Sequence, residues 1–298
     1  MSDLSPTTPL PSPSGQRIRR PGRTRSVGAD PLVRIAFALL AVLLVLAVLQ
    51  ATTGFAGSTN DTVGPRLQPP SSAWILGTDN LGRSLLPRLL QGIGTTLLLS
   101  AIAVAVSATV ATMLGLVAGY VGGGVSEAVL RVVDVIYAFP ALILAILVSA
   151  VLGPGQEAAL VSIVLITIPL MTRMVRISAR QTTSRDFVIA ARISGVSGAR
   201  IITTHLLPNA SGTIAVQASY ALSVAILVEG GLSFLGYGVQ VPQASLGLLI
   251  QDGMLYLTQA PWLALGPGVV LVLAILSVNL IGDGLRDRLE PRETRSLT

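Results

Sequence analysis

Few side chains in this 298-residue sequence could take part in covalent chemistry. There is one histidine, His205, and no cysteine, which excludes thiol nucleophiles and cysteine-ligated metals. A lone histidine without a neighbouring nucleophile or a set of ligands supports neither a reaction nor a metal site. All twenty basic residues are arginines, so guanidinium chemistry is what remains. The residue types therefore predict binding, with no catalytic residue and no metal ligand.

A polar, arginine-bearing segment, residues 185–209, lies between two strongly apolar runs. It predicts two short helices. Ser184 is suited to cap the first helix, Asp186 lies in its first turn, and Gly195 is suited to follow its last turn. The second helix is expected to end before Pro208, because proline disrupts a continuing helix.

The first of these helices has two different faces. Arg185, Ile189 and Arg192 fall on one stripe at helical spacing. The opposite face, expected to lie against the chain's own helices, holds mainly small residues: Phe187, Ala190, Ala191 and Ser194. The stripe predicts a docking surface for a partner with an acidic-rimmed hydrophobic groove. The alternative is that these arginines only set the topology of a solvated loop.

The elements that position this segment are predicted to be membrane helices. Hydrophobic residues make up 51% of the chain and charged residues 11%, against about 25% charged in soluble domains. Apolar runs of about 18 residues predict transmembrane helices. The sequence therefore predicts an all-α integral membrane protein with six transmembrane helices, at residues 32–49, 95–117, 128–152, 158–175, 210–228 and 262–281.

Arginine placement gives the orientation through the positive-inside rule. If the N-terminus is cytoplasmic, seventeen of the twenty arginines lie inside, and only Arg66, Arg83 and Arg88 lie outside. Both termini are then cytoplasmic, in a multi-pass membrane protein. Because the positive charge follows this topology and forms no patch with interleaved aromatics, no nucleic-acid partner is expected.

The predicted organisation has four parts. They are a disordered cytoplasmic tail (1–29), a first transmembrane helix with an extracytoplasmic segment (30–94), a five-helix core (95–284) that includes the loop 176–209, and a cytoplasmic tail (285–298). A second long outer segment, 230–261, is expected to be interfacial or re-entrant, where irregular backbone is tolerated if protein covers it.

Three polar residues in the spans are candidates for a gate or pathway, because charges inside a membrane are functional candidates by default. Asp134 follows Arg131 by one turn, so a local pair is the alternative. Glu229 has no arginine nearby in the sequence, and a solvated interfacial carboxylate is the alternative to a gate or a contact with a substrate amine. Asn279 would most simply bond a neighbouring helix.

The polar segment also resembles a known motif. AARISG (190–195), nine residues, and then HLLP (205–208) are similar to the EAA loop of ABC-importer permeases. Where that motif has its glutamate, this chain has Ile189. Seven further blocks, in order, resemble the C-type permease of dipeptide and oligopeptide importers: LGTDNLGRSLL (76–86), AGYVGG (118–123), RVVDVIYAFP (131–140), LGPG (152–155), EGGLSFLGYGVQVP (229–242), APWLALGPG (260–268) and NLIGDGLRDRLEPR (279–292).

This resemblance implies a type I-like permease fold with a cytoplasmic coupling loop, in the bacterial cytoplasmic membrane. It implies pairing with a homologous B-type permease, docking of the loop on one or two cytoplasmic ATP-binding subunits, and delivery of substrate by an extracytoplasmic binding lipoprotein. The docking residues implied are Arg185, Asp186, Ile189, Ala190, Ala191, Arg192, Gly195, His205 and Pro208. No phosphate-binding loop is present, so ATP and Mg²⁺ are expected on the partners and no cofactor on this chain.

Other functions are weighed against peptide import. Importers of nickel chelates, glutathione or haem have similar permeases. A stand-alone channel or secondary transporter predicts inverted repeats and a midplane site of its own, and neither is found in the sequence. A membrane-embedded enzyme would need a nucleophile–base pair or metal ligands. The sequence therefore predicts a transport subunit, with membrane lipid around it, and not an enzyme.

Overall fold

The computed structural model describes residues 31–289, and its helices confirm the expected all-α fold. The predicted tail 1–29 and the last nine residues of the tail 285–298 lie outside this range. Two isolated β-bridges, Thr62–Arg83 and Thr78–Ser84, connect parts of the irregular segment 54–84. The helices are α1 (Pro31–Thr53), α2 (Leu85–Val121), α3 (Gly123–Tyr137), α4 (Ala141–Leu152), α5 (Gln156–Thr183), α6 (Asp186–Ile193), α7 (Gly198–Ile201), α8 (Leu207–Phe234), α9 (Leu246–Met254) and α10 (Trp262–Leu289), with a π-helical turn, Ile202–Leu206, between α7 and α8.

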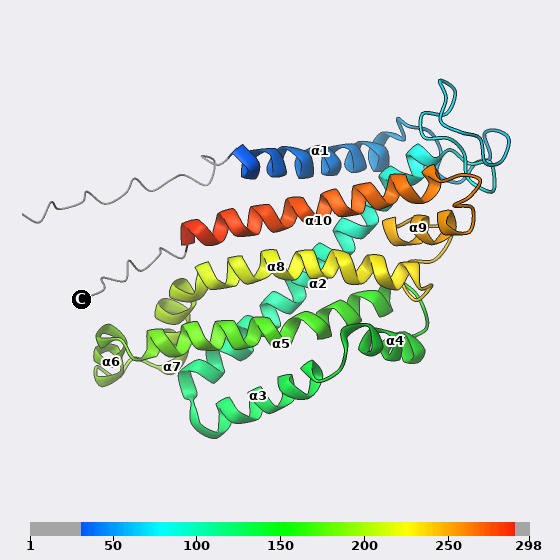
Figure 1. The fold of residues 1–298 in the computed structure, drawn as a ribbon. Helices are drawn as coiled ribbons and strands as arrows, with labels where there is room; N and C mark the ends of the chain where they lie inside the picture. The colour runs from blue at the N-terminus through cyan, green and yellow to red at the C-terminus, as the bar shows by residue number, and fades with distance from the viewer. Residues whose placement is uncertain (1–30, 290–298) are drawn as a thin grey trace, which may run out of the picture.

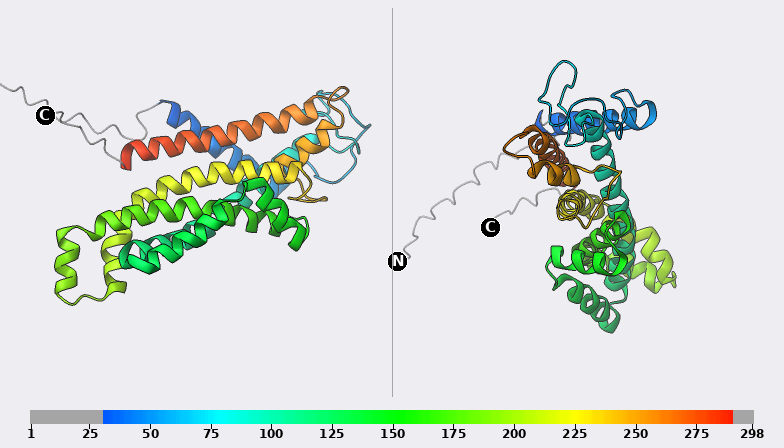
Figure 2. Two further views of the ribbon diagram at one scale, coloured as in Figure 1. Left: turned by 60° about the horizontal axis from the view of Figure 1, so that its bottom comes forward. Right: turned by 90° about the vertical axis from the view of Figure 1, so that its right-hand side faces the viewer.

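The long helices form a row. α1 packs on α10, α10 on α8, and α8 on α5, while α2 crosses this row and contacts several of its members (Figure 1). An end-on view shows α10, α8 and α5 one beside the next with α2 along their flank (Figure 2). Within residues 31–289, five helices are long and apolar enough to span a membrane, and the bent pair α3 and α4 makes a sixth if it counts as one span.

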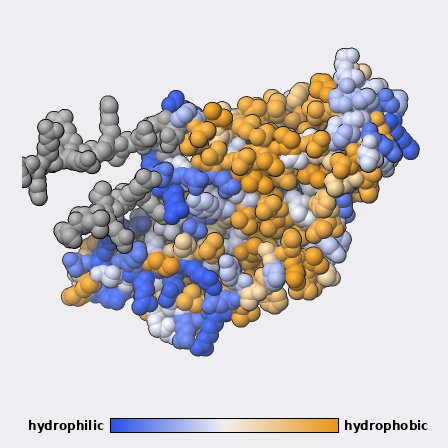
Figure 3. All heavy atoms as spheres, viewed as in Figure 1, coloured by the Kyte–Doolittle hydropathy of each residue, from blue (hydrophilic) through white to orange (hydrophobic). Residues whose placement is uncertain are grey.

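The surface separates into an apolar band and two polar ends (Figure 3). One end carries the start of α1 at Pro31, the end of α10 at Leu289, and α6; the other carries residues 54–84 and α9 (Figure 1). The predicted topology requires both tails and the docking loop on one side, and this arrangement agrees with it. That this side is the cytoplasm stays a prediction.

The predicted span 128–152 is wrong as a single straight helix. It is broken into α3 and α4, which meet at an angle of 87°. The break falls at residues 138–140, where Pro140 lacks a backbone N–H donor and disfavours the helical conformation of the residue before it. Pro169, by contrast, lies inside α5 without ending it.

Close packing of α2 against α5 depends on two glycines. A Cβ atom at Gly115 would lie 2.8 Å from Cβ of Val175, and one at Gly119 would lie 2.6 Å from Cβ of Ala179. Small residues at this spacing let two helix backbones approach closely, which is how helices commonly associate in membranes. The two glycines therefore bring α2 close to α5, the helix that leads into the docking loop.

Candidate functional site

The candidate docking loop is an ordered turn of helix between α5 and α8. Its helix α6 begins after Arg185, whose backbone is extended, and not after Ser184 as predicted. Ser184 instead closes α5, and its hydroxyl donates to the carbonyl oxygen of Gln181 at 2.9 Å. The helix therefore starts one residue later than the sequence pattern suggested, because the preceding helix uses Ser184.

Gly195 ends α6 in the predicted position. Its φ of +77° lies in the left-handed region, which side chains disfavour. The N–H of Gly195 donates to the carbonyl oxygen of Arg192, and the N–H of Val196 donates to that of Ala191, both at 3.1 Å. These two bonds form a Schellman motif, which satisfies carbonyls left free at the helix end. The loop is thus fixed by hydrogen bonds within its own backbone.

The buried face of α6 is not the predicted one. Val188 is fully buried and Ala191 is partly buried, while Ala190 and Ser194 are exposed. Phe187 is 43% exposed, and its ring lies against that of His205 with centroids 5.8 Å apart. Val188 packs into a hydrophobic cluster at this end of the molecule: Leu116, Val175, Ala179, Ile201, Leu206 and Ala210.

The outward face of α6 is apolar with charges beside it. Ile189 is 45% exposed and Ile193 is 82% exposed, although both are large hydrophobic residues in a polar part of the surface. Arg185 and Asp186, at the start of the helix, are also exposed. A helix that presents isoleucines outward and a valine inward can bind a partner's groove while it remains attached to its own chain.

Arg192, which was predicted to face a docking partner, instead contacts a residue of its own chain. Its guanidinium lies over the ring of Tyr120, 5.0 Å from the centroid, so that it faces α2. Helix α7 also lies against this ring: a Cβ atom at Gly198, its first residue, would lie 2.9 Å from Cε1 of Tyr120. Tyr120 is therefore in contact with both short helices of the loop.

The second helix of the loop does not end before Pro208, which corrects the prediction. α7 continues through the π-helical turn into α8, and Pro208 lies in the first turn of α8. The N–H of Leu207 donates to the carbonyl oxygen of Ile202, five residues back. This wider turn accommodates the proline, whose missing donor costs least at a helix start. The carbonyl oxygen of His205 accepts a bond from Nδ2 of Asn209 at 2.7 Å.

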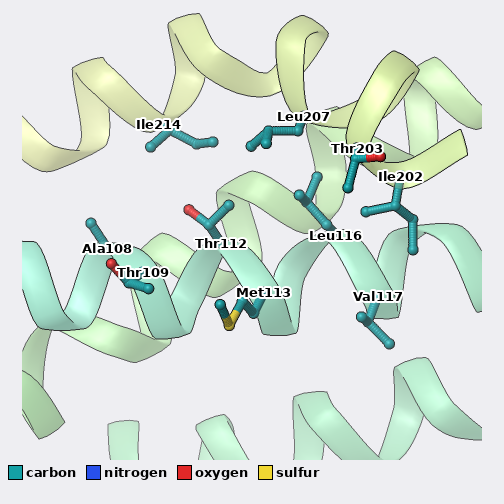
Figure 4. A pocket seen from close by; sticks show the side chains of 10 residues that line it. All are labelled: Ala108, Thr109, Thr112, Met113, Leu116, Val117, Ile202, Thr203, Leu207 and Ile214. Carbon is teal, nitrogen blue, oxygen red and sulfur yellow. The ribbon is translucent and has the colours of Figure 1, made fainter. Parts of the chain in front are cut away.

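A hollow of about 500 Å³ lies beside the π-helical turn. In Figure 4 the side chains of α2 face those of the turn and of α8 across it. Its lining is almost entirely apolar apart from three threonines: Ala108, Thr109, Thr112, Met113, Leu116, Val117, Ile202, Thr203, Leu207 and Ile214. The docking end thus has an apolar recess in addition to the exposed isoleucines.

The three predicted pathway residues all have surroundings that differ from those expected. Asp134 does not pair with Arg131; it bonds Arg173 of α5, while Arg131 pairs with Glu127 at 2.6 Å. Both of these pairs are largely exposed. Asn279 is half-buried on α10, and its side chain has no hydrogen bond to any residue in the range 31–289.

Glu229 is fully buried, so its interpretation as a solvated interfacial residue is wrong. Its Oε1 accepts a hydrogen bond from the hydroxyl of Ser233 at 2.7 Å, and Oε2 has no partner. The same hydroxyl accepts from the backbone N–H of Val239 at 3.0 Å. Glu229 therefore links the end of α8 to the segment that leads to α9. α9 is a short helix largely covered by protein, and its interpretation as an interfacial or re-entrant segment stays a prediction.

The sequence reasoning missed a cluster of charges at the opposite end, which we call the outer charge cluster: Asp79, Arg83, Arg88 and Asp252. Asp79 accepts a bond from Nε of Arg83 at 2.7 Å. Arg88, in the first turns of α2, has no exposed surface. Its Nε is 3.6 Å from Asp79, its Nη2 is 3.9 Å from Asp252 on α9, and none of its nitrogens forms a hydrogen bond.

The outer charge cluster balances two arginines with two carboxylates. Burial raises the pKa of Asp252, and the charges of Arg88 and Arg83 act in the opposite direction. A signal was present in the sequence, since two of the three arginines on the outer side, Arg83 and Arg88, lie within nine residues of Asp79. The cluster joins the outer segment, α2 and α9. Nowhere in residues 31–289 do three or more histidine or carboxylate side chains gather as a metal site.

A family model and individual proteins similar to this chain all belong to membrane components of transport systems. Residues 111–295 match the family of binding-protein-dependent transport system inner membrane components. The chain is 38% identical over 227 residues to the dipeptide transport system permease protein DppC of Alkalihalophilus pseudofirmus, which covers 76% of this chain and 75% of that protein. It is 39% identical over 235 residues to the oligopeptide transport system permease protein OppC of Mycobacterium tuberculosis, covering 78% and 80%.

The fold is also similar to a solved structure. The methionine ABC transporter MetNI in an inward-facing conformation aligns with a TM-score of 0.56 at 20% sequence identity, over 69% of this chain and 97% of the aligned chain. Identity at this level supports the shared fold alone. The relatives with closer sequences are named as permease proteins of peptide transport systems.

Proposed function

This chain belongs to the family of binding-protein-dependent transport system inner membrane components, and on that premise we propose that it is a permease subunit of an ATP-driven importer of di- and oligopeptides. The observation that carries the proposal is α6. It is a short ordered helix outside the apolar band, with exposed isoleucines on one face and Val188 anchored on the other. A loop with this construction has a surface to offer to another protein.

The partner for α6 is a cytoplasmic ATP-binding subunit. Ile189 and Ile193 would fill an apolar groove, and Arg185 would meet carboxylates at its rim. Arg192 contributes less to this contact, because its guanidinium lies over Tyr120. With Ile189 in place of the motif glutamate, docking depends on shape and apolar contact more than on an ion pair at that position.

The energy for transport comes from the partners. The sequence contains no phosphate-binding loop, so ATP and Mg²⁺ would bind to the ATP-binding subunits, and this chain would need no cofactor. Closure of those subunits would move α6 and α7, and with them the helices to which they are attached. A second, homologous B-type permease would complete the path, which would open alternately to each side.

The outer end would receive the substrate. Residues 54–84 and α9 form the polar end opposite α6, and the outer charge cluster holds them to α2. A substrate-binding lipoprotein would dock on this ordered surface and release its peptide to the path. Membrane lipid would surround the apolar band between the two ends.

Reconstitution of the complete importer in proteoliposomes tests the proposal. A labelled dipeptide, a longer oligopeptide, a nickel chelate, glutathione and haem would be offered with the cognate binding protein and ATP. ATP-dependent uptake of the peptides alone supports the function. Uptake of one of the other compounds alone would assign a different cargo. ATP-independent flux through this chain by itself would replace the importer with a channel or secondary transporter.

A further inference from the structure

One helix connects the two functional ends of the molecule. α2 has 37 residues, which at about 1.5 Å per residue corresponds to roughly 55 Å. This exceeds the hydrocarbon core of a bilayer, about 30 Å, by a wide margin. Arg88 lies in its first turns within the outer charge cluster, and Tyr120 lies in its last turn beside the docking loop (Figure 1).

The ring of Tyr120 contacts both helices of the loop. The guanidinium of Arg192, from the last turn of α6, lies over the ring, 5.0 Å from its centroid. Gly198, the first residue of α7, lies against the ring, and no side chain larger than hydrogen fits there without moving it. A displacement of either helix would therefore be transmitted to this ring.

Movement of Tyr120 cannot be absorbed locally. The residue directly before it, Gly119, brings the α2 backbone against α5, with a would-be Cβ 2.9 Å from the carbonyl oxygen of Arg176. Gly115 repeats this contact one turn earlier, against Val175. Packed interfaces of this kind shift as units, because they have no free volume in which to deform.

We propose that Tyr120 is the positioning residue through which the docking loop moves α2, and through α2 the outer end of the molecule. This inference rests on the proposed function and names the route by which ATP-driven closure reaches the substrate side. The ring touches neither nucleotide nor substrate. It acts by keeping α6 and α7 in register with the end of α2.

The test uses the complete importer in proteoliposomes and measures peptide molecules imported per ATP hydrolysed. Tyr120→Ala should keep hydrolysing ATP but import at least about fivefold fewer peptides per ATP, the lower range of typical coupling between sites. Tyr120→Phe keeps the ring and should stay within about twofold of the unmodified importer, since the cation–π contact needs only the ring face.

Tyr137 provides a matched control. It is also a tyrosine at a helix end, with the guanidinium of Arg173 4.8 Å from its ring centroid, but it ends α3, which packs mainly on α5 and α2. Tyr137→Ala should leave the ratio of import to hydrolysis unchanged. An equal loss in Tyr137→Ala and Tyr120→Ala would overturn the proposal, as would an unchanged ratio in Tyr120→Ala.

A second variant keeps the proposal testable if Tyr120→Ala does not assemble. Arg192→Gln removes only the cation above the ring, and co-purification of the ATP-binding subunits would verify its assembly. It should lower the same ratio, by less than Tyr120→Ala would. A normal ratio in assembled Arg192→Gln would refute the role of the ring contact. If the unmodified importer moves no peptide, the proposed function itself fails, which is a separate result.

Discussion

Replacement of Gly195 separates backbone conformation from side-chain contact in the docking loop. The residue has φ of +77°, and a Cβ atom built there meets no other atom within 4 Å. A larger residue would therefore not collide with anything. Its whole effect would come from forcing an L-amino acid into the left-handed region, which would weaken the Schellman motif at the end of α6.

The size of this effect follows from the cost of that conformation. The left-handed conformation costs an ordinary L-residue roughly 1–2 kcal/mol, and a β-branched residue lies at the upper end of this range. After glycine, asparagine adopts this conformation most readily. One to two kcal/mol changes an equilibrium by about 5–30-fold. Gly195→Val should thus reduce the ratio of ordered to disordered loop by this factor, Gly195→Ala by less, and Gly195→Asn least.

The assay is peptide import per ATP hydrolysed in the reconstituted importer, with hydrogen exchange of the α6 amides as a direct measure of loop order. All three variants should insert in the membrane normally, because Gly195 lies outside the apolar band. Gly153 gives a matched control: it has φ of +84° and nothing within 4 Å of a built Cβ, but it follows α4. Gly153→Val should leave α6 exchange unchanged.

Two results would refute this reasoning. Normal import by Gly195→Val would remove the docking role of the loop conformation. Equal losses in the valine and asparagine variants would show that the glycine matters for some reason other than its left-handed backbone.

Three further predictions concern the outer end. Arg88→Met should lower the stability of the detergent-solubilised chain by less than the roughly 3–5 kcal/mol that breaking a fully buried pair costs, because Asp252 loses its arginine but is 39% exposed, while Asp79 keeps Arg83. Adding Asp252→Asn should restore part of the loss, and a double variant less stable than Arg88→Met would contradict this charge balance. Burial raises the folded-state pKa of the Asp252 carboxyl above its ordinary value of 3.8, so this carboxyl binds its proton more tightly in the folded chain than in the unfolded chain. Stability should therefore fall as pH rises through that raised pKa, and thermal melts of Asp252→Asn should lack this component. Gly247→Ala should prevent normal folding, because its Cβ would lie 2.1 Å from the carbonyl oxygen of Gly230, whereas Gly266→Ala, with nothing within 4 Å, should melt like the unmodified chain.

The sequence predicted those features that depend on composition and local backbone chemistry. Apolar runs located the membrane helices, because a span must satisfy its backbone within one segment of known length. Gly195 was placed correctly because few other residues adopt its conformation. The resemblance of the chain to peptide permeases was also correct, and it came from short blocks of motif sequence.

Features that depend on tertiary packing were predicted less well. The buried face of α6 differs from the predicted one by one residue, Val188 in place of Phe187, which turns it by about 100°. Small residues at helical spacing did not determine which face packs on the rest of the chain. Pro208 was taken as a helix end, but the π-helical turn before it makes room for the ring. Arg88 was predicted to lie on the outer side, but its partner was not predicted, because Asp252 is 164 residues away in the sequence. No local pattern could have joined the two.

Cross-linking from α6 tests the central claim most directly. The chain has no cysteine, so a single cysteine at Ile189 would be its only thiol. In membranes that contain the complete importer, Ile189→Cys should form a cross-link to an ATP-binding subunit, whereas Val63→Cys, equally exposed on the outer segment, should form none. If Ile189→Cys forms no such cross-link in a complex that imports peptide, α6 is not the docking helix.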